Sequence, residues 1–175
     1  MIVLLVNMIQ RPEDEVKKKI EGWLLEDGFN LQPPSSKASE RVRFLMEFKE
    51  THGLEYFVLQ FAEKKDQIMV GLTLDIGQSH IESLRQMDGT KRNDFLSDLY
   101  LDLNRTDCLF VPDPPQLPTC FRIFYPIWYD GLTKDSFMRA YLRVSFVSEL
   151  IHLRLLRLIG EPVTVQRKSP SGRFM

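Results

Sequence analysis

The pattern of apolar and polar positions is clearest between Arg41 and Ile76, where it predicts three successive antiparallel strands. Apolar and polar or small residues alternate over residues 42–49 and again over residues 67–76. A period of two is typical of a strand. Residues 54–62 are apolar at odd and even positions alike, as expected of a central strand with a neighbour on each side. Short polar links join the three segments, so the pattern predicts an antiparallel meander.

The period becomes that of a helix before and after this meander. A proline and acidic residues at its start, and Gly28 after its end, predict a helix over residues 12–27. After the meander, apolar residues at helical spacing predict a short helix capped by Ser79 and a longer one from Thr90 to Asn104.

Two further strands, residues 108–111 and 119–129, are predicted on either side of a proline-dense loop. Residues 29–31 add a short extended piece. Pro126 lies inside the last strand and predicts an edge strand or a bulge there, because proline cannot donate to a sheet ladder. The element order is therefore α-βββ-α-ββ-α, with a long helix at its end. This order predicts an α+β two-layer sandwich, in which helices cover an antiparallel sheet of about five strands.

Composition narrows the classes of protein. The 175 residues, 43% of them hydrophobic, fit a single domain over residues 1–160, with an apolar arm over 1–10 and a mobile basic tail over 161–175. The arm is expected to be an edge strand or packed segment, or else a segment exchanged in a dimer.

A net charge of -1 makes nucleic acid an unexpected partner. The arm is far shorter than the roughly 20 residues that span a bilayer, so no membrane partner is expected and a cytoplasmic location is favoured.

Residues with catalytic or metal-binding potential are scattered along the chain. Cys108 and Cys120 lack CxxC spacing and the three histidines are far apart, so no metal site is predicted. We expect reduced thiols, or a disulfide if a hairpin places the two cysteines opposite one another. The sequence has no GxSxG, P-loop, GxGxxG or HExxH motif, so no catalytic residue and no cofactor is assigned. Asp75, at the end of a strand, and His80, near the start of a helix, are expected to form a structural pair or, alternatively, an acid–base couple.

The last helix, from Thr133 as its cap to Gly160 as its stop, carries more apolar residues than one contact needs. A helix that is apolar most of the way round is buried on more than one side. A second stripe mixes arginines with apolar residues, a composition that interfaces favour. The alternative is that these arginines lay their stems over the core and keep their charges in water. We predict a contact with another chain, most simply a homodimer, through Arg139, Arg143, Phe146, Leu150, Arg154 and Arg157.

The order of elements over residues 12–160 resembles the type III secretion chaperone-like fold. The likeness consists of a capped helix before the meander, residues 90–104 between the two parts of the sheet, the 108–129 hairpin and a closing helix. The chain is also similar to an uncharacterised archaeal conserved family of this fold, related to the bacterial sensory transduction regulators. Members of the chaperone group are small cytoplasmic dimers that hold extended client segments on apolar surface. The resemblance therefore implies a dimer and a protein client.

These observations favour a non-catalytic protein-binding, chaperone-like or regulatory module that acts as a dimer. The alternative is a small-molecule sensor or an uncharacterised enzyme, with a pocket between sheet and helices lined by Tyr56, Tyr125 and Trp128. A third hypothesis is binding of an anionic partner by the arginine stripe and the basic tail, which predicts strong salt dependence.

Overall fold

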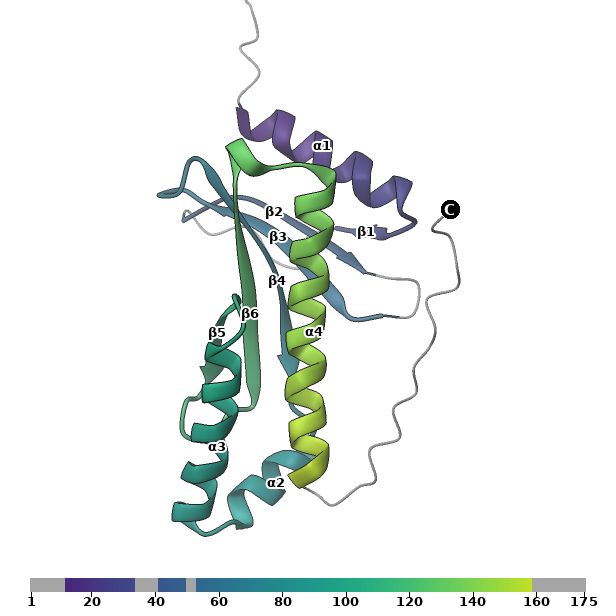
Figure 1. The fold of residues 1–175 in the computed structure, drawn as a ribbon. Coiled ribbons are helices and arrows are strands. Elements are labelled where there is room, and N and C mark those ends of the chain that lie inside the picture. The colour runs from purple at the N-terminus through teal and green to yellow at the C-terminus, as the bar shows by residue number, and fades with distance from the viewer. Residues whose placement is uncertain (1–11, 34–40, 50–52, 159–175) are drawn as a thin grey trace, which may run out of the picture.

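The computed structural model describes residues 12–33, 41–49 and 53–158 (Figure 1). The predicted apolar arm over residues 1–10 and basic tail over residues 161–175 lie outside the described residues. The helices are α1 (Pro12–Glu26), α2 (Gln78–Gln86), α3 (Gly89–Asn104) and α4 (Lys134–Leu158), with a short 3₁₀ helix η1 (Tyr129–Gly131) before α4.

In the described ranges, six strands form one antiparallel sheet in the order β1-β2-β3-β4-β6-β5. The predicted meander is confirmed as β2, β3 and β4, and the α+β class with helices packed on the sheet is confirmed as well. The sheet has six strands rather than about five because the short extended piece after α1 pairs with β2. The strands are β1 (Asn30–Gln32), β2 (Val42–Lys49), β3 (Glu55–Phe61), β4 (Gln67–Asp75), β5 (Leu109–Asp113) and β6 (Cys120–Trp128).

Strand β6 has a neighbour on both sides over its first part only, so the edge position predicted from Pro126 is confirmed locally. It pairs with β4 along its whole length, but with β5 only from Cys120 to Phe124. Pro126 lies opposite Met69 of β4, beyond the last residue that β5 pairs with. The proline therefore falls where β6 has no β5 neighbour that needs an N–H donor.

The hydrophobic core lies between the sheet and the helices. Figure 1 shows α4 lying lengthwise over β4 and β6, and these elements are in contact. The helices contribute apolar residues that include Ile20 of α1, Leu84 of α2, Leu99 of α3 and Phe137 of α4. All the buried strand residues of the core come from one face of the sheet: Phe44, Met46, Phe48, Tyr56, Val58, Ile68, Val70, Leu72, Phe121, Ile123 and Ile127. Each large side chain buried there contributes roughly 1.5–3 kcal/mol.

Gly28 ends α1 as the sequence predicts. Its φ of 79° is in the left-handed region, which glycine adopts without steric cost. The Phe29 N–H donates to the Leu24 carbonyl at 2.9 Å, so the chain turns directly from the helix into β1. This turn places α1 over the β1 edge of the sheet.

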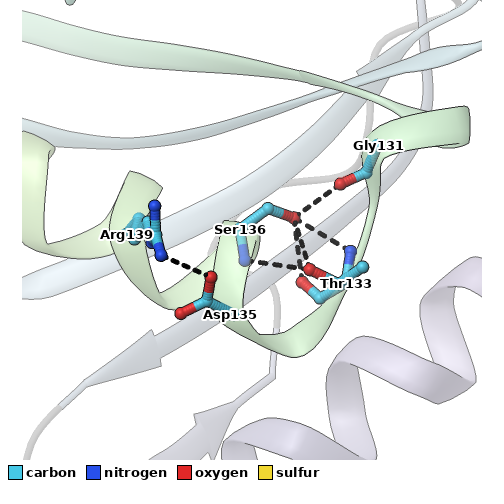
Figure 2. Close-up of polar contacts among 5 residues, drawn as sticks. All are labelled: Gly131, Thr133, Asp135, Ser136 and Arg139. Carbon is cyan, nitrogen blue, oxygen red and sulfur yellow. Dashed lines mark hydrogen bonds and ion pairs between the residues drawn. The ribbon is translucent and has the colours of Figure 1, made fainter.

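Thr133 caps α4, also as predicted (Figure 2). The Ser136 N–H donates to Thr133 Oγ1 at 3.1 Å, and the Thr133 N–H donates to Ser136 Oγ at 2.9 Å. This reciprocal pair has the geometry of a capping box, with serine in the place of the usual glutamate. Ser136 Oγ also donates to the Gly131 carbonyl at 2.7 Å, which ties the start of α4 to η1.

The caps predicted for the two middle helices are wrong by a few residues. Helix α2 begins after Gly77, which provides no side-chain cap, so Ser79 lies inside the helix. Helix α3 is capped by Asp88, whose Oδ1 accepts a hydrogen bond from the Thr90 N–H at 2.9 Å. Asp and Thr are both good caps, and the choice between two neighbouring candidates depends on backbone geometry.

Candidate protein-binding surfaces

Most of the apolar surface of α4 is covered by the chain itself. Among the described residues of this helix, the large apolar side chains that stay exposed are Leu142, at 60%, and Phe146, at 64%. Leu153 and Leu156 are partly exposed as well, so the excess apolar surface predicted for the last helix is present and is largest at Leu142 and Phe146. The covered residues are Phe137, Tyr141, Val144, Val147, Ile151 and Leu155, which are buried, and Met138, Leu150 and Leu158, which pack against the core while partly exposed.

Three of the four arginines predicted at the contact surface are paired within the chain. Two of the pairs join α4 to α3 or to the loop after it, and so hold the last helix against its neighbour. The aspartates balance the positive charge of these three arginines, so the arginines attract an anionic partner less strongly. The pairs are Arg139 with Asp135, Arg143 with Asp107, and Arg154 with Asp102.

Arg143 has a second intrachain contact, because its guanidinium lies 5.1 Å from the ring centre of Tyr125 on β6. The hydrogen bond to Asp107 and the neighbouring Tyr125 raise the pKa of Arg143 above its ordinary value. Beside it, between α4 and the loop from α3 to β5, is a shallow hollow of about 390 Å³. The hollow is lined by Arg105, Thr106, Asp107, Leu142, Arg143, Phe146 and Val147.

The face of the sheet turned away from the core cluster carries an apolar area from β2 to β5, beside polar residues such as Glu47, Thr73 and Arg122. On this side Leu109, Val111 and Trp128 are 53%, 47% and 50% exposed. An antiparallel sheet covered on one side usually has polar residues on the other. We call this apolar set the open face: Leu45, Phe57, Leu59, Phe61, Met69, Leu109, Val111, Phe124, Pro126 and Trp128.

Phe57 and Phe124 meet over Gly71 at the centre of the open face. The register places Gly71 of β4 opposite Phe57 on one side and Phe124 on the other. The two ring centres are 5.7 Å apart, at an angle of 63°. A Cβ at residue 71 would lie 2.8 Å from the Phe57 ring and 2.5 Å from the Ile123 carbonyl oxygen. Glycine is required there because no side chain fits beneath the rings.

The open face was not assigned from the sequence, although its signal was visible. The apolar run over residues 54–62 was interpreted as a strand with a neighbour on each side, which β3 indeed has. Lateral neighbours, however, do not explain apolar residues on both faces of a strand. The even-numbered residues from Tyr56 to Gln60 are buried, and Phe57, Leu59 and Phe61 point to the open side.

The three aromatic residues predicted to line a pocket do not converge. Tyr56 is buried in the core at 3% exposure, and Tyr125 lies on the same face of the sheet, near Arg143. Trp128 lies on the open face, because three residues along a strand reverse the direction of the side chain. A second hollow of about 450 Å³ lies elsewhere, lined by Glu13, Asp14, Lys17, Arg43 and Phe44.

The other candidates for chemistry also lie apart. Both ring nitrogens of His80 are buried without a hydrogen-bond partner in the described part of the chain, so the predicted pair with Asp75 is not formed. Cys108 and Cys120 are free thiols, and the alternative of a disulfide is not realised. Burial raises the pKa of Cys108 to about 11. In residues 12–33, 41–49 and 53–158, no three His, Cys, Asp or Glu side chains gather as metal ligands would.

The fold and its surfaces define a class: an α+β protein with a helix-covered antiparallel sheet, whose candidate contact sites are exposed apolar surfaces. The chain belongs to the family described as uncharacterized conserved protein (DUF2299), whose model matches residues 16–155. No protein with a curated description matches the sequence. No helix in the described ranges combines the length and apolar character needed to cross a membrane.

Two solved structures are similar to this chain. One is an uncharacterized protein from Methanothermobacter thermautotrophicus, 24% identical, with a TM-score of 0.72 over 81% of this chain and 98% of that one. The other is a chain of the ExsC–ExsE complex, 18% identical, with a TM-score of 0.53 over 81% of this chain and 93% of that one. At these identities the likeness shows the fold alone. It is consistent with the resemblance to the type III secretion chaperone-like fold.

Proposed function

We propose that this chain is a non-catalytic protein-binding module with a chaperone-like or regulatory action, and that it works as a homodimer in the cytoplasm. The observation that carries the proposal is the apolar surface left exposed on both the open face and α4. Contiguous exposed apolar patches of more than a few hundred Å² mark interaction sites. The free thiols Cys108 and Cys120 support a reducing compartment. The ExsC–ExsE complex supports protein binding by a related fold.

The outer flank of α4 is the surface that we assign to the protein partner. Leu142 and Phe146 are one helical turn apart, and both line the hollow beside Arg143. An exposed aromatic ring next to a hollow and an arginine has the composition of an interface hot spot. Of the residues predicted from the sequence, Phe146 and Arg143 belong to this surface. Leu150 packs partly against the core and contributes less to it.

Capture of partners from the native cell lysate tests this assignment with a matched pair of variants. Leu142 on α4 and Leu25 on α1 are the same residue at nearly the same exposure, 60% and 61%. Immobilised wild-type chain and the Leu25→Asp variant are expected to retain the same protein in near-stoichiometric amount. Leu142→Asp and Phe146→Asp are expected to lose it, because a carboxylate at the contact must be desolvated without a partner.

Far-UV circular dichroism of all four proteins controls for folding. Equal retention by wild type, Leu142→Asp and Phe146→Asp would remove α4 as the partner surface. If wild type retains no protein in stoichiometric amount, the protein-binding function itself is wrong.

A further inference from the structure

We infer that the homodimer forms through the open face of the sheet, with two copies stacked face to face about a two-fold axis. This inference rests on the homodimer of the proposed function and names its contact surface. It leaves the flank of α4 free for a different protein. Three properties of the open face select a second copy as the occupant: its backbone, its size and its charges.

The open face presents side chains rather than backbone. Around Gly71, strands β3, β4 and β6 each form ladders with neighbours on both sides, whereas β6 beyond Phe124 pairs with β4 alone. An extended peptide laid across Phe57, Leu59 and Met69 would leave its own backbone groups buried against apolar atoms, which is costly. The occupant must therefore bring a backbone that is already hydrogen-bonded, as a helix or another sheet does.

The width of the open face favours a sheet over a single helix. It extends from Leu45 on β2 to Leu109 on β5, across five strands. At about 4.8 Å per strand spacing this is roughly 19 Å. One helix with its side chains is only about 10–12 Å wide. A second copy presents a face of the same width, and two sheets pack readily at about 10 Å separation.

The area of the open face suits a stable dimer. Five strands of up to nine residues give a face of roughly 500 Å² in projection. The accessible surface of corrugated side chains exceeds this projection, and a standard interface takes roughly 800 Å² per partner. The exposed apolar side chains of α4, Leu142 and Phe146, are too few to provide such an area.

Two ion pairs on this side of the sheet form within one chain, although Glu47 and Asp75 also lie on this side. Arg122 of β6 pairs with Asp113 of β5 at 2.6 Å, and Lys49 of β2 pairs with Glu55 of β3 at 3.5 Å. Both pairs lie in the rows beside Phe57 and Phe124, at the border of the apolar area. Two copies of this face can meet without opposing uncompensated like charges at these pairs.

Sedimentation velocity with wild type and four single variants of the full chain tests the inference. Leu109→Glu and Trp128→Glu change side chains of the open face that are half exposed, so the fold tolerates them. Leu25→Glu and Leu142→Glu are controls of similar exposure on α1 and α4. We expect wild type and both controls to sediment at twice the monomer mass of 20.5 kDa. The two open-face variants should dissociate with a Kd raised about tenfold or more.

Two other outcomes are distinguishable. A wild-type dimer that Leu142→Glu dissociates, while Leu109→Glu and Trp128→Glu leave it intact, overturns the inference and keeps the homodimer, with α4 as its contact. A wild-type chain that stays monomeric at every concentration overturns both the inference and the homodimer. Circular dichroism of each variant shows whether a lost dimer reflects a lost fold.

Discussion

The two faces of the sheet carry similar apolar residues but have different environments. Phe48, on the covered face, is fully buried, and its ring lies within 5.4–6.2 Å of the rings of Phe29, Tyr56 and Tyr141. Phe57, on the neighbouring strand, points to the open side, is only half-buried and contacts Phe124. Alternation along a strand shows which residues share a face. It does not show which face the helices will cover.

The same comparison explains why most of the apolar residues of the last helix are covered within the chain. Helix α4 is apolar over much of its circumference because it packs on β4 and β6 and also faces α2 and α3. Its covered residues serve these several neighbours, so most of its apparent excess is used within the chain. The sheet, in contrast, has no described helix over its open face. The larger uncovered apolar surface of the described residues therefore lies on the sheet.

Truncating one phenylalanine on each face should give the largest difference in the free energy of unfolding. Phe48→Ala removes a fully buried ring from the core and is expected to lower the free energy of unfolding by about 3–5 kcal/mol. Phe57→Ala should lower the free energy of unfolding much less at low protein concentration, where the open face is not in contact with a second copy. Its cost should grow with concentration if that face is buried between two copies. Urea unfolding followed by circular dichroism measures both, and equal losses at all concentrations would contradict the distinction.

Adding a methyl group at Gly71 should have an intermediate effect. The new Cβ would meet the Ile123 carbonyl and the Phe57 ring, so Gly71→Ala is expected to destabilise the chain by about 1–3 kcal/mol. The matched control is Gly22→Ala in α1, where nothing lies within 4 Å of the new Cβ. It should stabilise the chain by about 0.5–1 kcal/mol through helix propensity. Thermal unfolding of the two variants checks the opposite signs, and a neutral Gly71→Ala would show that the rings separate easily.

The smallest effect is a difference in thiol reactivity between the two sides. Cys120 lies in line with Arg122 on the open side and is partly exposed, whereas Cys108 is 6% exposed. Burial raises the pKa of Cys108 to about 11, so a smaller fraction of Cys108 is thiolate at pH 8 than for a thiol with the ordinary pKa. Iodoacetamide should therefore modify Cys120 at least about tenfold faster at pH 8. The difference should narrow as the pH rises toward the pKa of Cys108.

Mass spectrometry of the digested protein measures the two rates of modification. In denaturing urea both thiols should react alike, which controls for the reagent. Faster labelling of Cys108 in the native protein would mean that the structure around Cys108 opens readily.

The sequence by itself determined the elements that depend on local chemistry. Periodicity located the β2–β4 meander, and residues such as Gly28 and Thr133 marked where α1 ends and α4 begins, because backbone conformation and capping hydrogen bonds involve neighbours in the chain. The likeness of element order to a known fold followed from the same information. The cap of α3 was predicted at Thr90 and is Asp88, because both residue types cap helices and local information does not separate two positions this close.

Only the tertiary structure decided which surfaces remain uncovered. The sequence does not show that Asp102 and Asp107, more than 30 positions earlier, pair with Arg154 and Arg143. Likewise, the placement of all the described helices on one side left Phe57 and Phe124 on the other. The physical reason is that burial and ion pairing depend on contacts between segments far apart in the chain, and a period of two or 3.6 residues carries no information about them.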